Sequence, residues 1–189
     1  MRRIIVSALI TVGMAISIGS LINRAIGPTE GESMSMVMSD FTLAPLHGDA
    51  YDQAFINQMT VHHTGAIAMA RLVQNSTNPE IRRLADSIIV SQSAQNSDMQ
   101  RWARRWGYEY HSPNQLTIAA MSSRMQGLTG DQLDKRFLFD MTSHHNTAVD
   151  MTSYSPTRAR HSEIKKLSRQ ISRDQTAEIS LMQTLLSQY

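Results

Sequence analysis

The chain of 189 residues is 41% hydrophobic, which is typical of a globular protein with one well-buried core. It contains no cysteine, and this excludes both a disulfide framework and a thiolate metal site. Its net charge of +2 depends on Arg2, Arg3 and Arg24, without which 15 basic residues face 16 acidic ones, so no nucleic-acid partner is predicted.

Residues 1–27 form a targeting segment. Arg2 and Arg3 precede an uncharged run over residues 4–22, which is longer than a usual signal-peptide core and almost long enough to span a bilayer. Small residues at 25–27 suit cleavage, whereas Arg24 does not. A cleaved signal peptide and an uncleaved membrane anchor therefore both remain open. Either alternative predicts export of the rest of the chain, with membrane contact only through this segment.

Residues 28–48 are predicted to be a flexible, methionine-rich arm. Met34, Met36 and Met38 lie in polar sequence that gives them no reason to pack, and His47 follows them. We interpret these four residues as a segment that captures a metal ion. The alternative is a hydrophobic tether that docks on the following domain.

Residues 49–189 are predicted to be all α-helical. Apolar residues at helical spacing favour one helix over 49–75 and a second from Pro79 to Trp106. Asn78 before Pro79 is typical of a helix start, and Gly107 of a helix end. The second helix brings Gln92 and Gln95 into its apolar face, where we expect the imidazoles of the first helix to be their hydrogen-bond partners.

The link over residues 107–129 is predicted to contain a short helix that opens at Ser112-Pro113 and carries Met121 and Met125. A capping box from Thr129 to Gln132 then favours a third helix ending near Ser153. Ser155-Pro156 is predicted to begin a fourth helix that continues to residue 187.

Two stretches of the chain resemble each other. Residues 52–70 and 134–152 share a His-His doublet flanked by methionine at an offset of 82, and a looser similarity follows each copy. The sequence therefore predicts a four-helix bundle built from two tandem two-helix repeats, residues 49–106 and 130–187.

Each repeat is predicted to carry at least one metal site. Helical spacing places the donors of one repeat toward one neighbourhood, and thioether with imidazole suits Cu(I), or its analogue Ag(I), better than hard cations. The alternatives are that the methionines only pack and that one histidine of each pair only supports the other. These donors are Met59, His62, His63 and Met69, then Met141, His144, His145 and Met151.

Other metal chemistries lack their motifs. The chain has no Glu-x-x-His for a di-iron centre, no Cys-x-x-Cys-His for haem and no His-Glu-x-x-His for hydrolytic zinc.

The pattern Met-x-x-His-His-x-x-Ala-[Ile/Val]-x-Met, followed by Gln-x-x-Glu-x-x-x-Met, resembles the CopM-like family of exported copper-binding proteins. The resemblance covers residues 50–187 and implies a ferritin-like bundle that binds Cu(I), with Cu(II) as a second oxidation state. It adds Met99 and Met182 to the implied ligands. Gln95 stands where the family pattern has Glu, which Glu178 keeps in the second repeat.

The resemblance implies a periplasmic protein that sequesters or chaperones Cu(I) in copper resistance, with a copper-sensing or efflux protein as partner. We expect no enzymatic activity. The alternatives are a cuprous oxidase that converts Cu(I) to Cu(II) with the help of Glu178, and a membrane-anchored structural bundle.

Overall fold

The computed structural model describes residues 43–189, and the segments predicted as leader and as Met34/Met36/Met38 arm lie outside that range. The described part is helical, with a single isolated bridge between Gly48 and Ala159. None of its helices is both long and apolar enough to cross a membrane. The helices are α2 (Gly48–Leu72), α3 (Pro79–Trp106), α4 (Gln115–Ser122), η2 (Ser123–Met125), α5 (Gly130–Thr152), α6 (Ser155–Arg158) and α7 (Ser162–Leu186).

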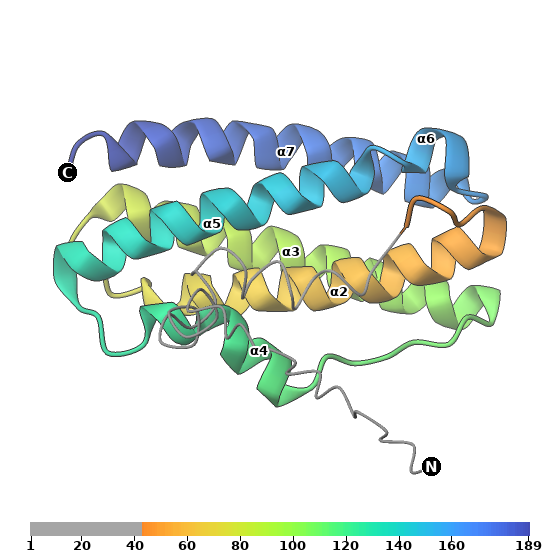
Figure 1. Ribbon diagram of the computed structural model, residues 1–189, viewed down its shortest axis with the longest axis horizontal. Helices are drawn as coiled ribbons and strands as arrows, with labels where there is room; N and C mark the ends of the chain where they lie inside the picture. Colours follow the sequence, from red (N-terminus) through yellow and green to blue (C-terminus); the bar gives the residue numbers. More distant parts are fainter. Residues whose placement is uncertain (1–42) are drawn as a thin grey trace, which may run out of the picture. The chain divides into compact units, whose positions relative to one another are not determined.

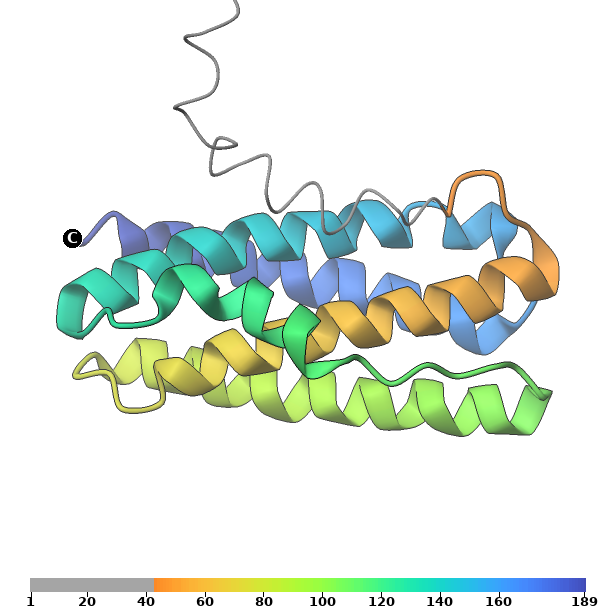
Figure 2. The same cartoon turned by 60° about the horizontal axis from the view of Figure 1, so that its bottom comes forward.

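Four long helices form the bundle. Helix α2 packs against α3, and α5 packs against α7, so that two antiparallel hairpins lie together (Figure 1). The link between the hairpins runs back along the bundle and places α4 against α2 (Figure 2). One long crossover between two helical hairpins is the connectivity of ferritin-like bundles. The predicted all-α fold class is therefore confirmed, whereas the duplication stays an inference from the sequence.

Helix α3 begins and ends at the predicted residues because both signals are local. The Asn78 side chain accepts hydrogen bonds from the backbone N–H groups of Glu80, at 2.9 Å, and Ile81, at 3.4 Å. Gly107 adopts a left-handed conformation with φ of 72°, which ends the helix. Glycine tolerates this conformation because it has no Cβ atom to clash with the backbone.

Two other predicted boundaries differ, and one predicted capping bond is absent. Thr129 precedes α5 as expected, but its side chain makes no capping hydrogen bond. Helix α4 begins at Gln115 instead of Ser112-Pro113, because the Asn114 side chain accepts from the N–H of Thr117 at 2.8 Å. Ser155-Pro156 opens only the short α6, and the long helix α7 starts anew at Ser162.

The break before α7 is held by a buried carboxylate from another helix. Asp52 of α2 is fully buried, and it accepts the backbone N–H groups of Arg160 at 3.1 Å and His161 at 2.8 Å. The ring Nδ1 of His161 lies 2.7 Å from the same carboxylate, and the ring stacks on Trp106 with centroids 3.7 Å apart. Asp52 thus caps the start of α7, where an anion is favourable.

We expect Asp52→Asn to lower the free energy of unfolding by about 3 kcal/mol, because an amide leaves at least one buried N–H group unpaired and removes the charge. Urea denaturation measures this loss. Asp49→Asn is the matched control, since Asp49 lies one turn earlier on α2 in an exposed ion pair with Arg160. Equal stability of the Asp52 variant and the wild type would contradict this role.

Candidate metal centre

A polar layer crosses the middle of the bundle between two apolar clusters. One cluster lies toward the α2–α3 turn and includes Met69, Met141 and Met182. The other lies toward α6 and includes Met59 and Met99, with Met151 packed against it. We call the residues between them the histidine layer; they are His62, His63, Gln92, Gln95, His144, His145, Gln175 and Glu178.

The histidine layer brings α2 and α5 into direct contact. The rings of His62 and His144 have centroids 3.6 Å apart, and His62 Nε2 lies 2.9 Å from the carbonyl oxygen of His144. A carbonyl oxygen only accepts, so Nε2 of His62 carries the proton and donates it. The lone pair of His62 is therefore on Nδ1, which has no hydrogen-bond partner.

His145 is held in a similar way by a carboxylate. Its Nε2 lies 2.8 Å from Oε2 of Glu178, whose side chain is 18% exposed. Donation to Glu178 leaves the lone pair on His145 Nδ1, which is buried and unpaired. A carboxylate that orients an imidazole and leaves its other nitrogen free is the usual arrangement behind a histidine metal ligand.

The layer leaves many buried polar atoms without a partner. An unpaired buried polar group costs about 1–3 kcal/mol, so most proteins contain few of them. The expected hydrogen bonds from the imidazoles to Gln92 are absent, since both of its side-chain polar atoms are unpaired. The unpaired atoms in the layer are His62 Nδ1, both ring nitrogens of His63 and His144, His145 Nδ1, Gln92 Nε2 and Oε1, Gln95 Oε1 and Gln175 Oε1. Such a concentration of unpaired donors and acceptors is what a ligand would satisfy.

Three of the imidazoles, those of His62, His63 and His144, are kept neutral by their surroundings. Burial lowers the pKa of His62 and of His144 well below 6.5, and the neighbouring imidazoles lower both further. Burial also lowers the pKa of His63 to about 3, although the adjacent Gln95 side chain offsets part of that shift. Because a metal binds the neutral ring, these residues need to lose no proton before they bind.

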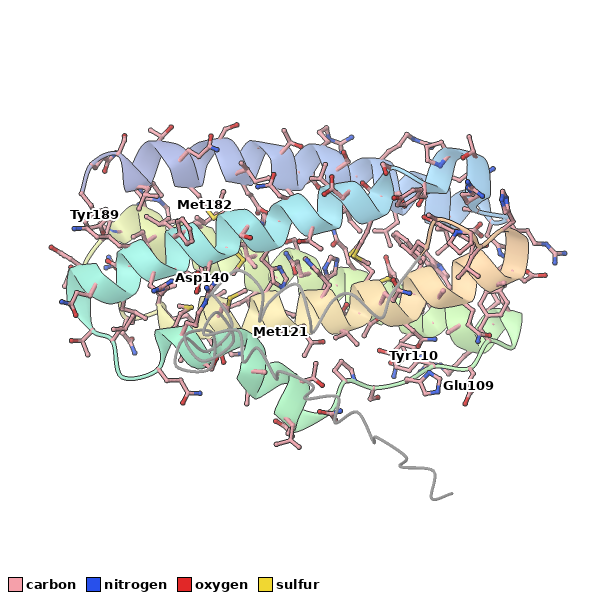
Figure 3. The ribbon with its side chains drawn as sticks, viewed as in Figure 1. Glu109, Tyr110, Met121, Asp140, Met182 and Tyr189 are labelled. Carbon is pink, nitrogen blue, oxygen red and sulfur yellow. The ribbon has the colours of Figure 1, made fainter. Side chains whose placement is uncertain are left out.

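Nitrogen and oxygen donors alone do not complete a site. Within residues 43–189, no three His, Asp or Glu side chains are grouped so that they could hold a metal ion. The other donors available in the core are the thioether sulfur atoms of several buried methionines. Met59, Met69, Met99, Met141 and Met182 are fully buried, and Met182 points from α7 into the bundle (Figure 3). A centre here would therefore combine imidazole with thioether, which suits a soft ion.

The methionines of one repeat do not all lie in one apolar cluster. Met59 and Met69 belong to different apolar clusters, because ten residues of helix separate them by about 15 Å. Each cluster instead takes methionines from both hairpins. His62 and His144 come from different repeats and touch, so the two doublets lie in one shared layer, and one metal site per repeat stays a prediction.

His47 lies away from the layer. It precedes α2 at an exposed position and contacts the Arg158 guanidinium. Fifteen helical residues place it about 22 Å from His62, so the two do not share an ion. The predicted partners of His47, Met34, Met36 and Met38, lie outside the described residues.

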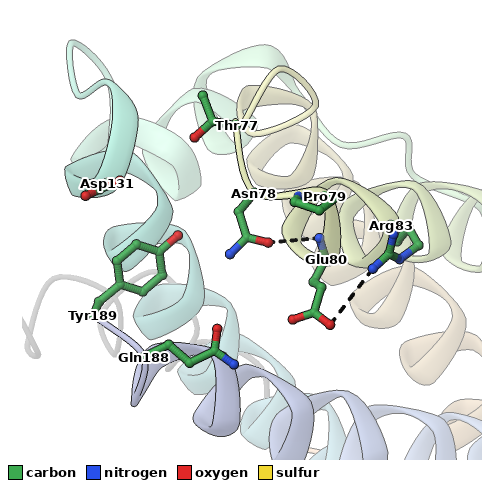
Figure 4. Close-up of a pocket in the computed structure, with 8 residues that line it drawn as sticks. All are labelled: Thr77, Asn78, Pro79, Glu80, Arg83, Asp131, Gln188 and Tyr189. Carbon is green, nitrogen blue, oxygen red and sulfur yellow. Dashed lines mark hydrogen bonds and ion pairs between the residues drawn. The ribbon is translucent and has the colours of Figure 1, made fainter.

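A surface hollow at the end of the bundle offers no comparable chemistry. Figure 4 shows two of its charged groups, Glu80 and Arg83, paired at 3.9 Å. The side-chain oxygen of Asn78 already accepts the hydrogen bond that caps α3. The hollow is lined by Thr77, Asn78, Pro79, Glu80, Arg83, Asp131, Gln188 and Tyr189.

Comparison with known proteins places this architecture in a family. The profile of the family described as "Domain of unknown function (DUF305)" matches residues 23–103 and residues 52–186. No curated protein sequence matches the chain.

Among solved structures, CopM in its Cu(I)-bound form is 31% identical, with a TM-score of 0.63 over 72% of this chain and 96% of that one. CopM in its Cu(II)-bound form is 32% identical, with a TM-score of 0.63 over 73% and 98%. A DUF305 protein from Streptomyces coelicolor that is predicted to be secreted is 29% identical, with a TM-score of 0.65 over 72% and 93%.

Proposed function

Because the chain belongs to the DUF305 family and buries a layer of unpaired imidazoles between methionines, we propose that it is an exported copper-binding protein. Its cargo is Cu(I), with Ag(I) as an analogue and Cu(II) as a second state. Support comes from CopM, a relative in fold and sequence that has been solved with Cu(I), Cu(II) and silver bound. The Streptomyces relative, which is predicted to be secreted, supports export.

The histidine layer is the observation that carries this proposal. Burial lowers the pKa of His62, His63 and His144, so these three imidazoles bind a cation without first losing a proton. The nearest abundant donors are thioethers, which are soft and uncharged and favour Cu(I) over Zn²⁺ or Mg²⁺. A chain without cysteine offers Cu(I) no thiolate that an oxidising compartment would consume.

The role that follows is sequestration or delivery of Cu(I) in the periplasm without turnover, with a copper-sensing or efflux protein as the recipient. The rival activity is a cuprous oxidase, and the bond between His145 and Glu178 favours it as the second candidate because it holds a carboxylate within the histidine layer. Oxygen uptake on addition of Cu(I) separates the two. Sustained uptake would establish the oxidase, and its absence with stable Cu(I) would establish a carrier.

We expect the exported domain to bind Cu(I) and Ag(I) tighter than Zn²⁺ by at least about two orders of magnitude at neutral pH. The reason is that no three His, Asp or Glu side chains of residues 43–189 group into a zinc site, whereas thioethers are available to a soft ion. Titration against a competing chelator for each ion measures the difference. Equal affinity for Zn²⁺ would overturn the proposed cargo.

A further inference from the structure

Helix α2 contains a glycine, Gly65, in its interior, where glycine destabilises a helix. Gly65 is buried within α2, two residues after the His62-His63 doublet. A Cβ at this position would lie 2.1 Å from the sulfur of Met121, closer than real Cβ contacts come. The missing side chain of Gly65 therefore makes room for the Met121 thioether.

The same gap opens onto the histidine layer. Nε2 of His144 lies 3.3 Å from the point that a Gly65 Cβ would occupy, so this nitrogen and the Met121 sulfur border one small space. Neither ring nitrogen of His144 has a hydrogen-bond partner. A thioether and an unpaired imidazole nitrogen thus meet inside the bundle.

Met121 reaches this space from outside the four-helix bundle. It belongs to α4, which packs against α2, and Figure 3 shows it between the two helices. Met121 is 7% exposed, whereas Met59, Met69, Met99, Met141 and Met182 have no exposed surface. Position 147, which the sequence repeat aligns with Gly65, is a threonine, and α4 packs mainly against α2.

We propose that Met121 is a ligand of the metal centre, supplying with His144 a mixed sulfur and nitrogen coordination for Cu(I). This inference rests on the proposed function and adds to it a donor from the link between the hairpins. It accounts for three observations together: the glycine at 65, the unpaired nitrogens of His144, and the burial of a link methionine against them. Soft donors of this kind favour a monovalent copper or silver ion.

Met121→Leu tests the ligand directly, since leucine keeps a similar volume and removes only the sulfur. We expect the Cu(I) affinity of the protein to fall at least about tenfold, because losses of that size follow even the removal of residues that only orient metal ligands. X-ray absorption of the Cu(I)-loaded protein should lose sulfur scattering. Met125→Leu is the matched control, because Met125 is buried four residues later in an apolar cluster.

Gly65→Ala provides a second variant that keeps the sulfur but displaces it. We expect it to weaken Cu(I) binding about as much as Met121→Leu, and the two changes combined to cost little more than either alone. Full affinity in Met121→Leu, or an equal loss in Met125→Leu, would overturn the role of Met121. Failure of the wild type to bind Cu(I) would instead overturn the proposed function itself.

Discussion

Replacing His62 and His144 together with leucine is expected to remove most Cu(I) binding and, at the same time, to stabilise the metal-free protein. The two rings touch and carry three buried nitrogen atoms without partners, each of which costs about 1–3 kcal/mol. Leucine fills much of the same volume with no polar atom. We expect the free energy of unfolding to rise by about 3 kcal/mol in urea denaturation.

His161→Leu is the matched control for this double variant. His161 also lies at a helix contact, but its ring is satisfied by Asp52 and stacked on Trp106. Its replacement should lower stability and leave Cu(I) affinity unchanged. A double His62/His144 variant that is less stable than the wild type, or that binds Cu(I) fully, would show that the layer is structural.

The single variants show whether the doublets act together. Because His62 and His144 lie in one layer, either change alone should cost most of the affinity that the pair costs. Two independent sites would instead give additive losses. The comparison uses the same chelator titration.

The metal-free protein is expected to unfold in mild acid, near pH 5. Above pH 6.5 the rings of His62, His63 and His144 are neutral in both states and contribute no pH dependence. Below it the unfolded chain takes up protons that the folded protein does not, since burial has lowered all three pKa values. Each ring then lowers the free energy of unfolding by about 1.4 kcal/mol per pH unit, so the three rings together lower it by about 4 kcal/mol per pH unit.

Urea unfolding at a series of pH values between 7 and 4.5 measures this slope. The His62→Leu/His144→Leu variant should retain about a third of it, because only His63 still titrates among the three. A wild-type protein that is equally stable at pH 7 and pH 4.5 would contradict the lowered pKa values.

Local signals predicted helices well, and distant contacts account for the failures. Asn78 and Gly107 fix both ends of α3 through bonds within a few residues. The break before α7 depends on Asp52, which lies more than 100 residues earlier in the chain, so no pattern near Ser155-Pro156 reveals it.

The donor types of the candidate centre were predictable, but their grouping was not. Helical spacing shows which face a side chain occupies without showing which residues of other helices lie at the same height. The contact of His62 with His144 follows from how α2 and α5 pack. The sequence places Met121 only in a link helix, since nothing nearby in the sequence shows that the link returns past Gly65.

The two apolar clusters also determine the unit that folds. Each draws on both hairpins: Met69 and Ile81 from the first meet Met141 and Leu185 from the second in one cluster, and the other cluster is divided likewise. A growing chain that has reached only the end of α3 therefore holds only a part of each cluster and leaves both of them open. We expect the protein to become compact only after α7 has been synthesised. Until then the apolar faces of the first hairpin stay exposed.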